Sequence, residues 1–266
     1  MSSIVRPTPA QMTRRLVVLA TAVFAVVIAY VQMALGWGQT PEEFAADSDG
    51  TLKVAGYAFS IWGLIYLGLL IYAVRQALPQ TGESTLIHRF GWASVAAFLG
   101  IGWWIVASAF DWEAATNVLI FGALIALLVP LVQNASVIRT LDRTDRDRLM
   151  VVWPLALLAG WLTVASPVNL LTVLTGNGDL PDSPSPVVWA LLAVAIVAAL
   201  AVLVTAAIRS MAYALPIAWG LLGVFVAELE RDRSMLAYAA LAAAMAVVVA
   251  AVILTFRLRR GVERPN

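Results

Sequence analysis

Long apolar runs alternate with short polar segments along the chain. Each run is close to the roughly 20 residues that an α-helix needs to cross the hydrocarbon core of a bilayer. The first run is longer than the core of a signal peptide and no small-residue cleavage site closes it, so we expect it to remain as a membrane span. The pattern predicts an all-α, polytopic transmembrane helix bundle with eight spans, at residues 16–35, 54–74, 90–110, 116–138, 149–174, 187–208, 211–227 and 235–256.

Basic residues fall almost entirely on one side of this predicted topology. With the N-terminus inside, only Lys53, Arg231 and Arg233 of the 17 lysines and arginines lie outside. Cytoplasmic segments of membrane proteins carry such an excess of positive charge. We therefore expect an integral membrane protein with cytoplasmic N- and C-termini, in the plasma (inner) membrane of a bacterium.

Composition narrows the classes of function. The chain is 62% hydrophobic and 12% charged, whereas a soluble domain averages roughly 25% charged residues. Its net charge of +1 provides no basic surface for nucleic acid. Cysteine is absent and His88 is the one histidine, so the sequence does not supply the several ligands of a zinc-type site. The lipid bilayer is the partner that composition itself implies, and we predict no metal site and no nucleic-acid partner.

The middles of the predicted spans contain no Asp, Glu, Lys, Arg or His. Ionisable groups inside a membrane mark proton relays and ion-coupled transport, and acid–base catalysis needs a positioned titratable group. Asp111 and Glu113 flank a short outer turn, where a charged helix cap explains them better than a catalytic carboxylate pair does. We predict no catalytic residues, which favours a non-enzymatic role and leaves the enzymatic question open.

Aromatic rings are what the predicted interior offers instead. Phe59, Trp62 and Tyr66 recur at helical spacing on one face of the second span, and Trp103 and Phe110 lie seven residues apart in the third. Such rings either pack helices together or, with a few polar groups, line a pocket for an apolar ligand. Both interpretations remain open at this point.

The fifth run mixes apolar residues with polar ones. It contains Thr163, Ser166 and Asn169, together with Trp161 and Pro167. Pro167 has no N–H and so frees the carbonyl of Thr163 one turn earlier, and lipid offers that carbonyl no donor. We therefore expect this helix to face a cavity or partner helices rather than lipid.

Two of these segments resemble a known family. The stretch WLTVASPVN (161–169) is similar to the fifth helix of the tryptophan-rich sensory protein or translocator protein family (TspO/MBR), with its Trp, Ala, two hydroxyl residues and Asn. FSIWGLIY (59–66) resembles the family's Phe–Pro–Trp–Tyr signature without the proline, and Trp103 takes the place of a family tryptophan. The resemblance covers residues 16–174, because that family has five helices. The first outer loop, residues 39–53, lacks the family's Pro- and Trp-rich lid motif.

The resemblance implies a five-helix bundle over residues 1–175, three additional transmembrane helices over 187–256 and a cytoplasmic tail at 257–266. It also implies a sensing or transport role, a hydrophobic small-molecule ligand of porphyrin or tetrapyrrole type, no covalent cofactor, and a homodimer. The ligand-binding residues that it implies are Phe59, Trp62, Tyr66, Trp103, Trp161, Thr163, Ser166 and Asn169. A permease for a small neutral or amphipathic solute and a non-catalytic membrane scaffold remain as alternatives.

Overall fold

The computed structural model describes residues 7–46, 51–78 and 84–257, and within these ranges the chain is helical with no strand. In this described part, eight helices are long enough and apolar enough to cross a membrane, which confirms the predicted number of spans and the all-α fold class. The element order is α1 Pro9–Leu35, α2 Pro41–Ala46, η1 Gly56–Ser60, α3 Ile61–Ala77, α4 Thr85–Ala109, α5 Glu113–Gln133, α6 Ala135–Thr140, η3 Arg148–Val152, α7 Trp153–Gly176, α8 Pro186–Ile208, α9 Met211–Glu230, α10 Ser234–Val252 and η4 Ile253–Arg257.

Besides shifts at several helix ends, the structure differs from the sequence prediction at two places. The predicted span 116–138 is interrupted at Asn134, where α5 ends and the short α6 begins. The Asn134 side chain donates to the Pro130 carbonyl at 2.8 Å, and this bond stabilises the end of α5. The predicted loop 36–53 contains α2, which begins at Pro41 directly after Thr40. A proline at the first position of a helix is preorganised for this role.

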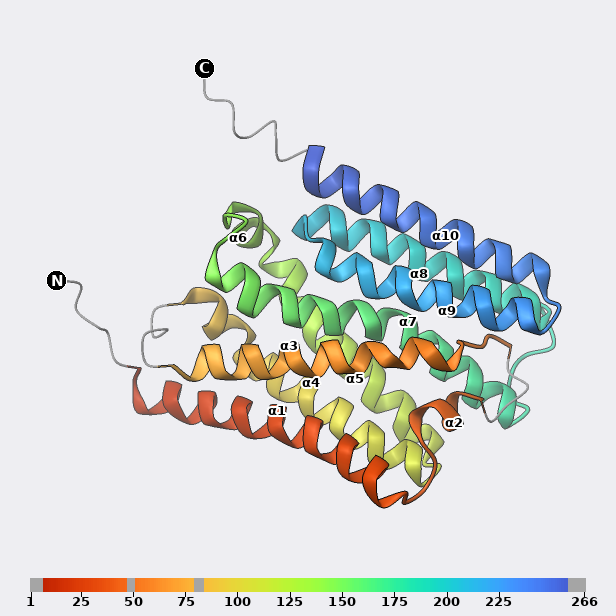
Figure 1. Ribbon diagram of the computed structural model, residues 1–266, viewed down its shortest axis with the longest axis horizontal. Coiled ribbons are helices and arrows are strands. Elements are labelled where there is room, and N and C mark those ends of the chain that lie inside the picture. The colour runs from red at the N-terminus through yellow and green to blue at the C-terminus, as the bar shows by residue number, and fades with distance from the viewer. Residues whose placement is uncertain (1–6, 47–50, 79–83, 258–266) are drawn as a thin grey trace.

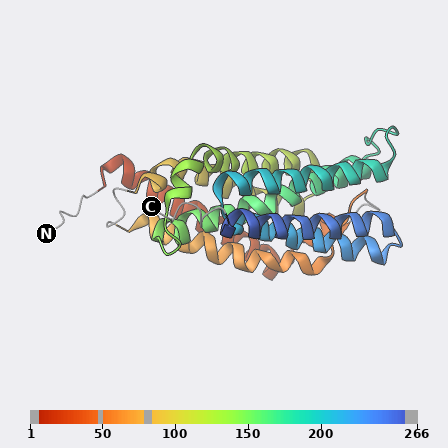
Figure 2. The same ribbon diagram turned by 90° about the horizontal axis from the view of Figure 1, so that it is seen from above.

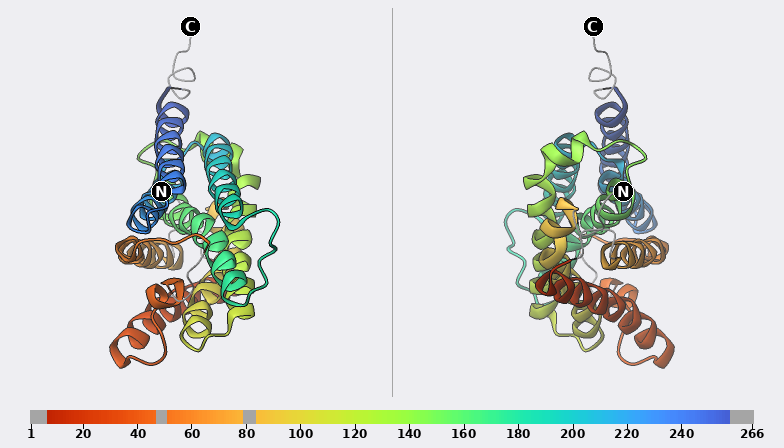
Figure 3. Two further views of the ribbon diagram at one scale, coloured as in Figure 1. Left: turned by 90° about the vertical axis from the view of Figure 1, so that its right-hand side faces the viewer. Right: turned by 90° about the vertical axis from the view of Figure 1, so that its left-hand side faces the viewer.

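Helix α7 is the centre of the bundle and contacts α3, α5, α8 and α9. In its most apolar stretch 72% of residues are buried, against 28% in α1 and in α10. Figures 1 and 3 show α8, α9 and α10 along one side of α7, with α1 and α4 along the other. Seen from above, the axes of the long helices lie roughly parallel to one another, with successive helices running in opposite directions along the chain (Figure 2). The exposed apolar faces of the outer helices are thus placed to meet lipid.

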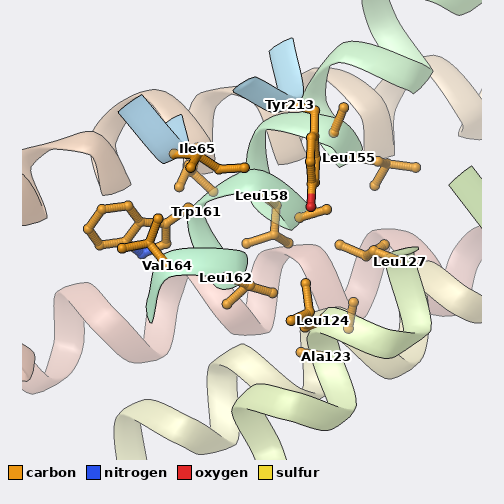
Figure 4. Packing of buried hydrophobic residues seen from close by; sticks show 14 of the residues in the cluster. Ile65, Ala123, Leu124, Leu127, Leu155, Leu158, Trp161, Leu162, Val164 and Tyr213 are labelled. Carbon is orange, nitrogen blue, oxygen red and sulfur yellow. The ribbon is translucent and has the colours of Figure 1, made fainter. Parts of the chain in front are cut away.

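Close packing on both sides of α7 forms the core. Figure 4 shows Leu158 and Leu162 of α7 between Tyr213 of α9 and Leu124 of α5. A Cβ atom added at Gly160 would lie 2.1 Å from the Tyr213 carbonyl oxygen, so the two backbones approach as closely as glycine allows. Helix α9 therefore packs directly on the predicted five-helix unit. The cytoplasmic termini and the division of the chain between residues 175 and 187 stay predictions.

Candidate functional site

A cavity of about 40 Å³ lies between α7 and the segment that leads into α3. Of the residues predicted to bind a ligand, Phe59, Trp62, Trp161 and Asn169 line it. The Phe59 ring meets the Trp161 ring edge-on, with centroids 6.0 Å apart, and the Trp62 ring does the same at 6.3 Å. The structure thus brings together rings that are about a hundred residues apart in the sequence.

Both polar atoms of the Asn169 side chain, Oδ1 and Nδ2, form hydrogen bonds within the protein. Its Oδ1 accepts from the indole N–H of Trp104 at 3.0 Å. Its Nδ2 donates to Thr116 Oγ1 at 3.0 Å and to Asn117 Oδ1 at 2.9 Å. Asn169 therefore fixes the orientation of Trp104 and joins α4, α5 and α7, while its predicted role as a hydrogen-bonding partner for a ligand stays a prediction.

Trp104, not Trp103, lines the cavity. Trp103 is 49% exposed and packs against Phe24 of α1, with ring centroids 5.7 Å apart. The polar residues of α4 could have decided between the two rings, because Ser108 is buried and a polar residue in a membrane helix faces the protein. Trp104 lies four residues from Ser108 and shares its face, whereas Trp103 lies about 140° away at roughly 100° per residue.

Three other predicted ligand-binding residues lie outside the cavity lining. The Thr163 hydroxyl donates to the Ala159 carbonyl at 2.8 Å and lies 2.8 Å from the Tyr213 hydroxyl, so it joins α7 to α9. Ser166 is fully buried and its hydroxyl has no hydrogen-bond partner. Tyr66 stacks on Trp62 with centroids 5.2 Å apart and faces the neighbouring groove described below.

Two polar atoms at the cavity are buried without a partner. They are the indole N–H of Trp62 and the hydroxyl of Thr172, a residue that is 5% exposed and that the sequence analysis did not single out. A buried polar group without a hydrogen bond is destabilising by about 1–3 kcal/mol. Both atoms are therefore placed to bind a polar group brought in by a ligand.

Helix α2 covers the cavity through Phe44. This ring is 3% exposed and meets Trp104 edge-on, with centroids 6.0 Å apart. Thr40 and Glu43 form a capping box, in which Glu43 Oε2 accepts from the Thr40 N–H at 2.6 Å and Thr40 Oγ1 accepts from the Glu43 N–H at 3.2 Å. The bond from the Thr40 N–H, supported by its hydroxyl, holds the pKa of Glu43 below its ordinary value. The Thr-x-x-Glu spacing is a helix-start signal that could have located α2 from sequence.

A second, roomier space adjoins the cavity. It has a volume of about 330 Å³, lies between α1, α2 and α3, and is lined in part by Tyr30, Glu42 and Tyr66. Phe59 and Trp62 line both spaces and form the partition between them. We call this second space the outer groove.

A sequence model described as TSPO-like protein matches residues 14–253. The chain belongs to this family. The match extends through α8, α9 and all of α10, whereas the resemblance noted in the sequence was expected to end at residue 174. No curated protein and no solved structure matched the chain.

The cavity of this TSPO-like protein is lined mainly by apolar side chains. None of the described residues that line the cavity is ionisable. Among the residues described by the structure, no group of three or more His, Asp or Glu lies close enough together to hold a metal ion. What the cavity presents is apolar surface, the edges of several rings and two buried polar atoms.

Proposed function

We propose that this TSPO-like membrane protein binds a flat hydrophobic molecule of porphyrin or tetrapyrrole type in the aromatic cavity, as part of a sensing or transport role. The observation that carries this proposal is the convergence of Phe59, Trp62, Trp104 and Trp161 on one cavity whose described lining residues are all uncharged. Aromatic edges and faces bind a flat apolar ligand without burying a charge. The free Trp62 N–H and Thr172 hydroxyl would bind its polar substituents.

The cavity would have to widen before a ligand of this kind could bind. Pockets for ligands of this kind have volumes of roughly 300–1,000 Å³, and the cavity holds about 40 Å³. The arrangement described above is therefore the closed one. Outward movement of α2 with Phe44, together with movement of the Phe59 and Trp62 rings that separate the two spaces, would join the cavity to the outer groove, which adds about 330 Å³.

A titration with protoporphyrin IX, followed by tryptophan fluorescence in detergent, tests the proposal. We expect saturable quenching of the wild-type protein. Trp161→Phe and Thr172→Val should each weaken binding about tenfold, since each removes a contact worth about 1–2 kcal/mol. Trp103→Phe is the matched control, because this ring is half exposed on the outside of the bundle, and it should leave the affinity unchanged. Absence of saturable quenching, or equal affinities for Trp161→Phe and Trp103→Phe, would contradict the proposal.

The succession of two spaces also favours a second candidate, a permease for a small neutral or amphipathic solute. The outer groove and the cavity meet at Phe59 and Trp62, so a solute could pass from one to the other if these rings moved. Uptake of solute into proteoliposomes, compared with liposomes that lack the protein, tests this candidate directly. Binding without uptake favours the sensing role.

A further inference from the structure

We propose that Gly220 and Gly223 of α9 set the width of the aromatic cavity and so determine which ligands fit it. The part of this inference that concerns ligands rests on the proposed function, whereas the part that concerns cavity width rests on the packing geometry alone. Among the described residues, none from α8, α9 or α10 lines the cavity. Helix α9 packs behind the lining residues, and it supports two parts of the cavity wall at once.

The first wall belongs to α7 and meets α9 at Gly220. A Cβ atom added at Gly220 would lie 2.9 Å from Val164 Cγ1 and 3.2 Å from Val164 Cβ. Val164 is 2% exposed and lines the cavity. The absence of a side chain at Gly220 is therefore what allows Val164 to lie back against α9. Any larger residue at position 220 would displace Val164 away from α9.

The second wall is the segment before α3, and it meets α9 one turn later, at Gly223. A Cβ atom added there would lie 2.8 Å from both Val54 Cγ1 and Ala58 Cβ. Val54 lines the cavity, as Val164 does. The Ala55 N–H donates to the Gly223 carbonyl at 3.0 Å, so the segment lies directly on the helix backbone. A side chain at position 223 would displace Val54 as position 220 displaces Val164.

Polar contacts keep both walls attached to α9. The Trp219 indole N–H donates to the Ala58 carbonyl at 2.9 Å. The Lys53 N–H donates to Glu228 Oε1 at 2.7 Å, and Glu228 is fully buried. On the α7 side, the Tyr213 hydroxyl lies 2.8 Å from that of Thr163. Because both walls are bonded to the same helix, α9 fixes the distance between them.

The size of the effect follows from packing. Contacts below 3.0 Å between carbon atoms are not tolerated, and overpacked interiors relax by shifting side chains and backbone. A cavity of about 40 Å³ has little volume to lose. One methyl group from α9 is therefore enough to close much of it. Helix α9 thus controls the width of a cavity that none of its own described residues lines.

The test measures the cavity first without any biological ligand. Xenon binds apolar cavities without needing a polar partner, so crystals of wild-type protein under xenon pressure should show anomalous density between Trp161 and Val54. Gly220→Ala and Gly223→Ala should each lose it. Gly122→Ala is the matched control, because Gly122 is also helical and a Cβ atom there would have no neighbour within 4 Å. The double variant Gly220→Ala with Val164→Ala should recover the xenon site.

Protoporphyrin IX then reports on the ligand. Its affinity should fall about tenfold or more in Gly220→Ala and Gly223→Ala, stay unchanged in Gly122→Ala, and return in the double variant. Xenon density that persists in both α9 variants overturns the inference, whatever the porphyrin does. Loss of xenon from both α9 variants, combined with no porphyrin binding by the wild type, supports the role of α9 in cavity width and refutes the proposed ligand class instead. If the single α9 variants fail to fold, Val164→Ala alone should enlarge the xenon site, and unchanged density there counts against the inference.

Discussion

Replacing Asn169 by leucine tests the assignment of this residue as a cross-helix clamp. Leucine has nearly the same shape as asparagine but makes none of its three side-chain hydrogen bonds, to Trp104, Thr116 and Asn117. Interhelical hydrogen bonds in membrane proteins contribute about 0.6 kcal/mol each on average, so their joint loss should lower the free energy of unfolding by about 2 kcal/mol. The Trp104 N–H contributes most, because it is left buried without a partner, whereas Asn117 is only partly buried and can reach water.

The assay is equilibrium unfolding of the detergent-solubilised protein, followed by near-ultraviolet circular dichroism of the tryptophans. A double-mutant cycle isolates the central bond. In a Trp104→Phe background the indole N–H is already gone, so Asn169→Leu should cost about 1 kcal/mol less than it does in the wild type. A cost for Asn169→Leu that is the same in both backgrounds, or below about 0.5 kcal/mol in the wild type, would refute the clamp and return Asn169 to the role of a free ligand-binding group.

Three further experiments test other parts of the structure. Glu228→Leu should lower the free energy of unfolding by about 2 kcal/mol. This loss is smaller than for a fully buried ion pair, because the arginine partners of Glu228 are partly exposed. Glu228→Gln should cause about half of that loss. The lowered pKa of Glu43 means that its capping box stabilises α2 at and above the ordinary value of 4.5 and that this stability is lost as the pH falls through the lowered pKa. A fluorescent label on a cysteine introduced at Ala46, in a chain that has no other, should report loosening of α2 on acidification, and Glu43→Gln should abolish that pH dependence. Tyr213→Phe should cost about 1 kcal/mol, and adding Thr163→Val should cost little more, because both remove the same hydrogen bond; full additivity in thermal unfolding would contradict it.

Local properties of the chain were enough to predict the bundle. Run length and apolarity decide whether a segment can cross a bilayer, and both can be counted in the sequence without knowledge of any partner. The polar content of 161–169 likewise predicted that this helix faces inward, and α7 is the most buried span. The Thr-x-x-Glu pattern at Thr40 was equally local, and α2 was missed because an acidic segment between spans was interpreted by composition alone.

The choice between adjacent aromatic residues depended on helix rotation. Trp103 and Trp104 are neighbours in sequence, and a rotation of about 100° exchanges which of them faces the protein. Nothing in the spacing of Trp103 and Phe110 fixes that rotation. Packing does: Gly102 lies against Phe24 and Ala25 of α1, and Gly100 against Leu119 and Ala123 of α5. With α4 held between these two helices, Trp104 faces the cavity and Trp103 faces outward.

The sequence by itself determined that this is a membrane bundle of eight helices that carry aromatic rings and no ionisable residue in the middles of their spans, because hydrophobicity and length act on each segment separately. The tertiary structure decided which polar side-chain groups form hydrogen bonds within the protein and which remain without a partner. Asn169 and Thr163 bind neighbouring helices, while Trp62 and Thr172 keep unpartnered atoms at the cavity. It also decided that α9 supports two cavity walls, since a hydrogen bond or a close approach between distant residues exists only once the helices are packed together.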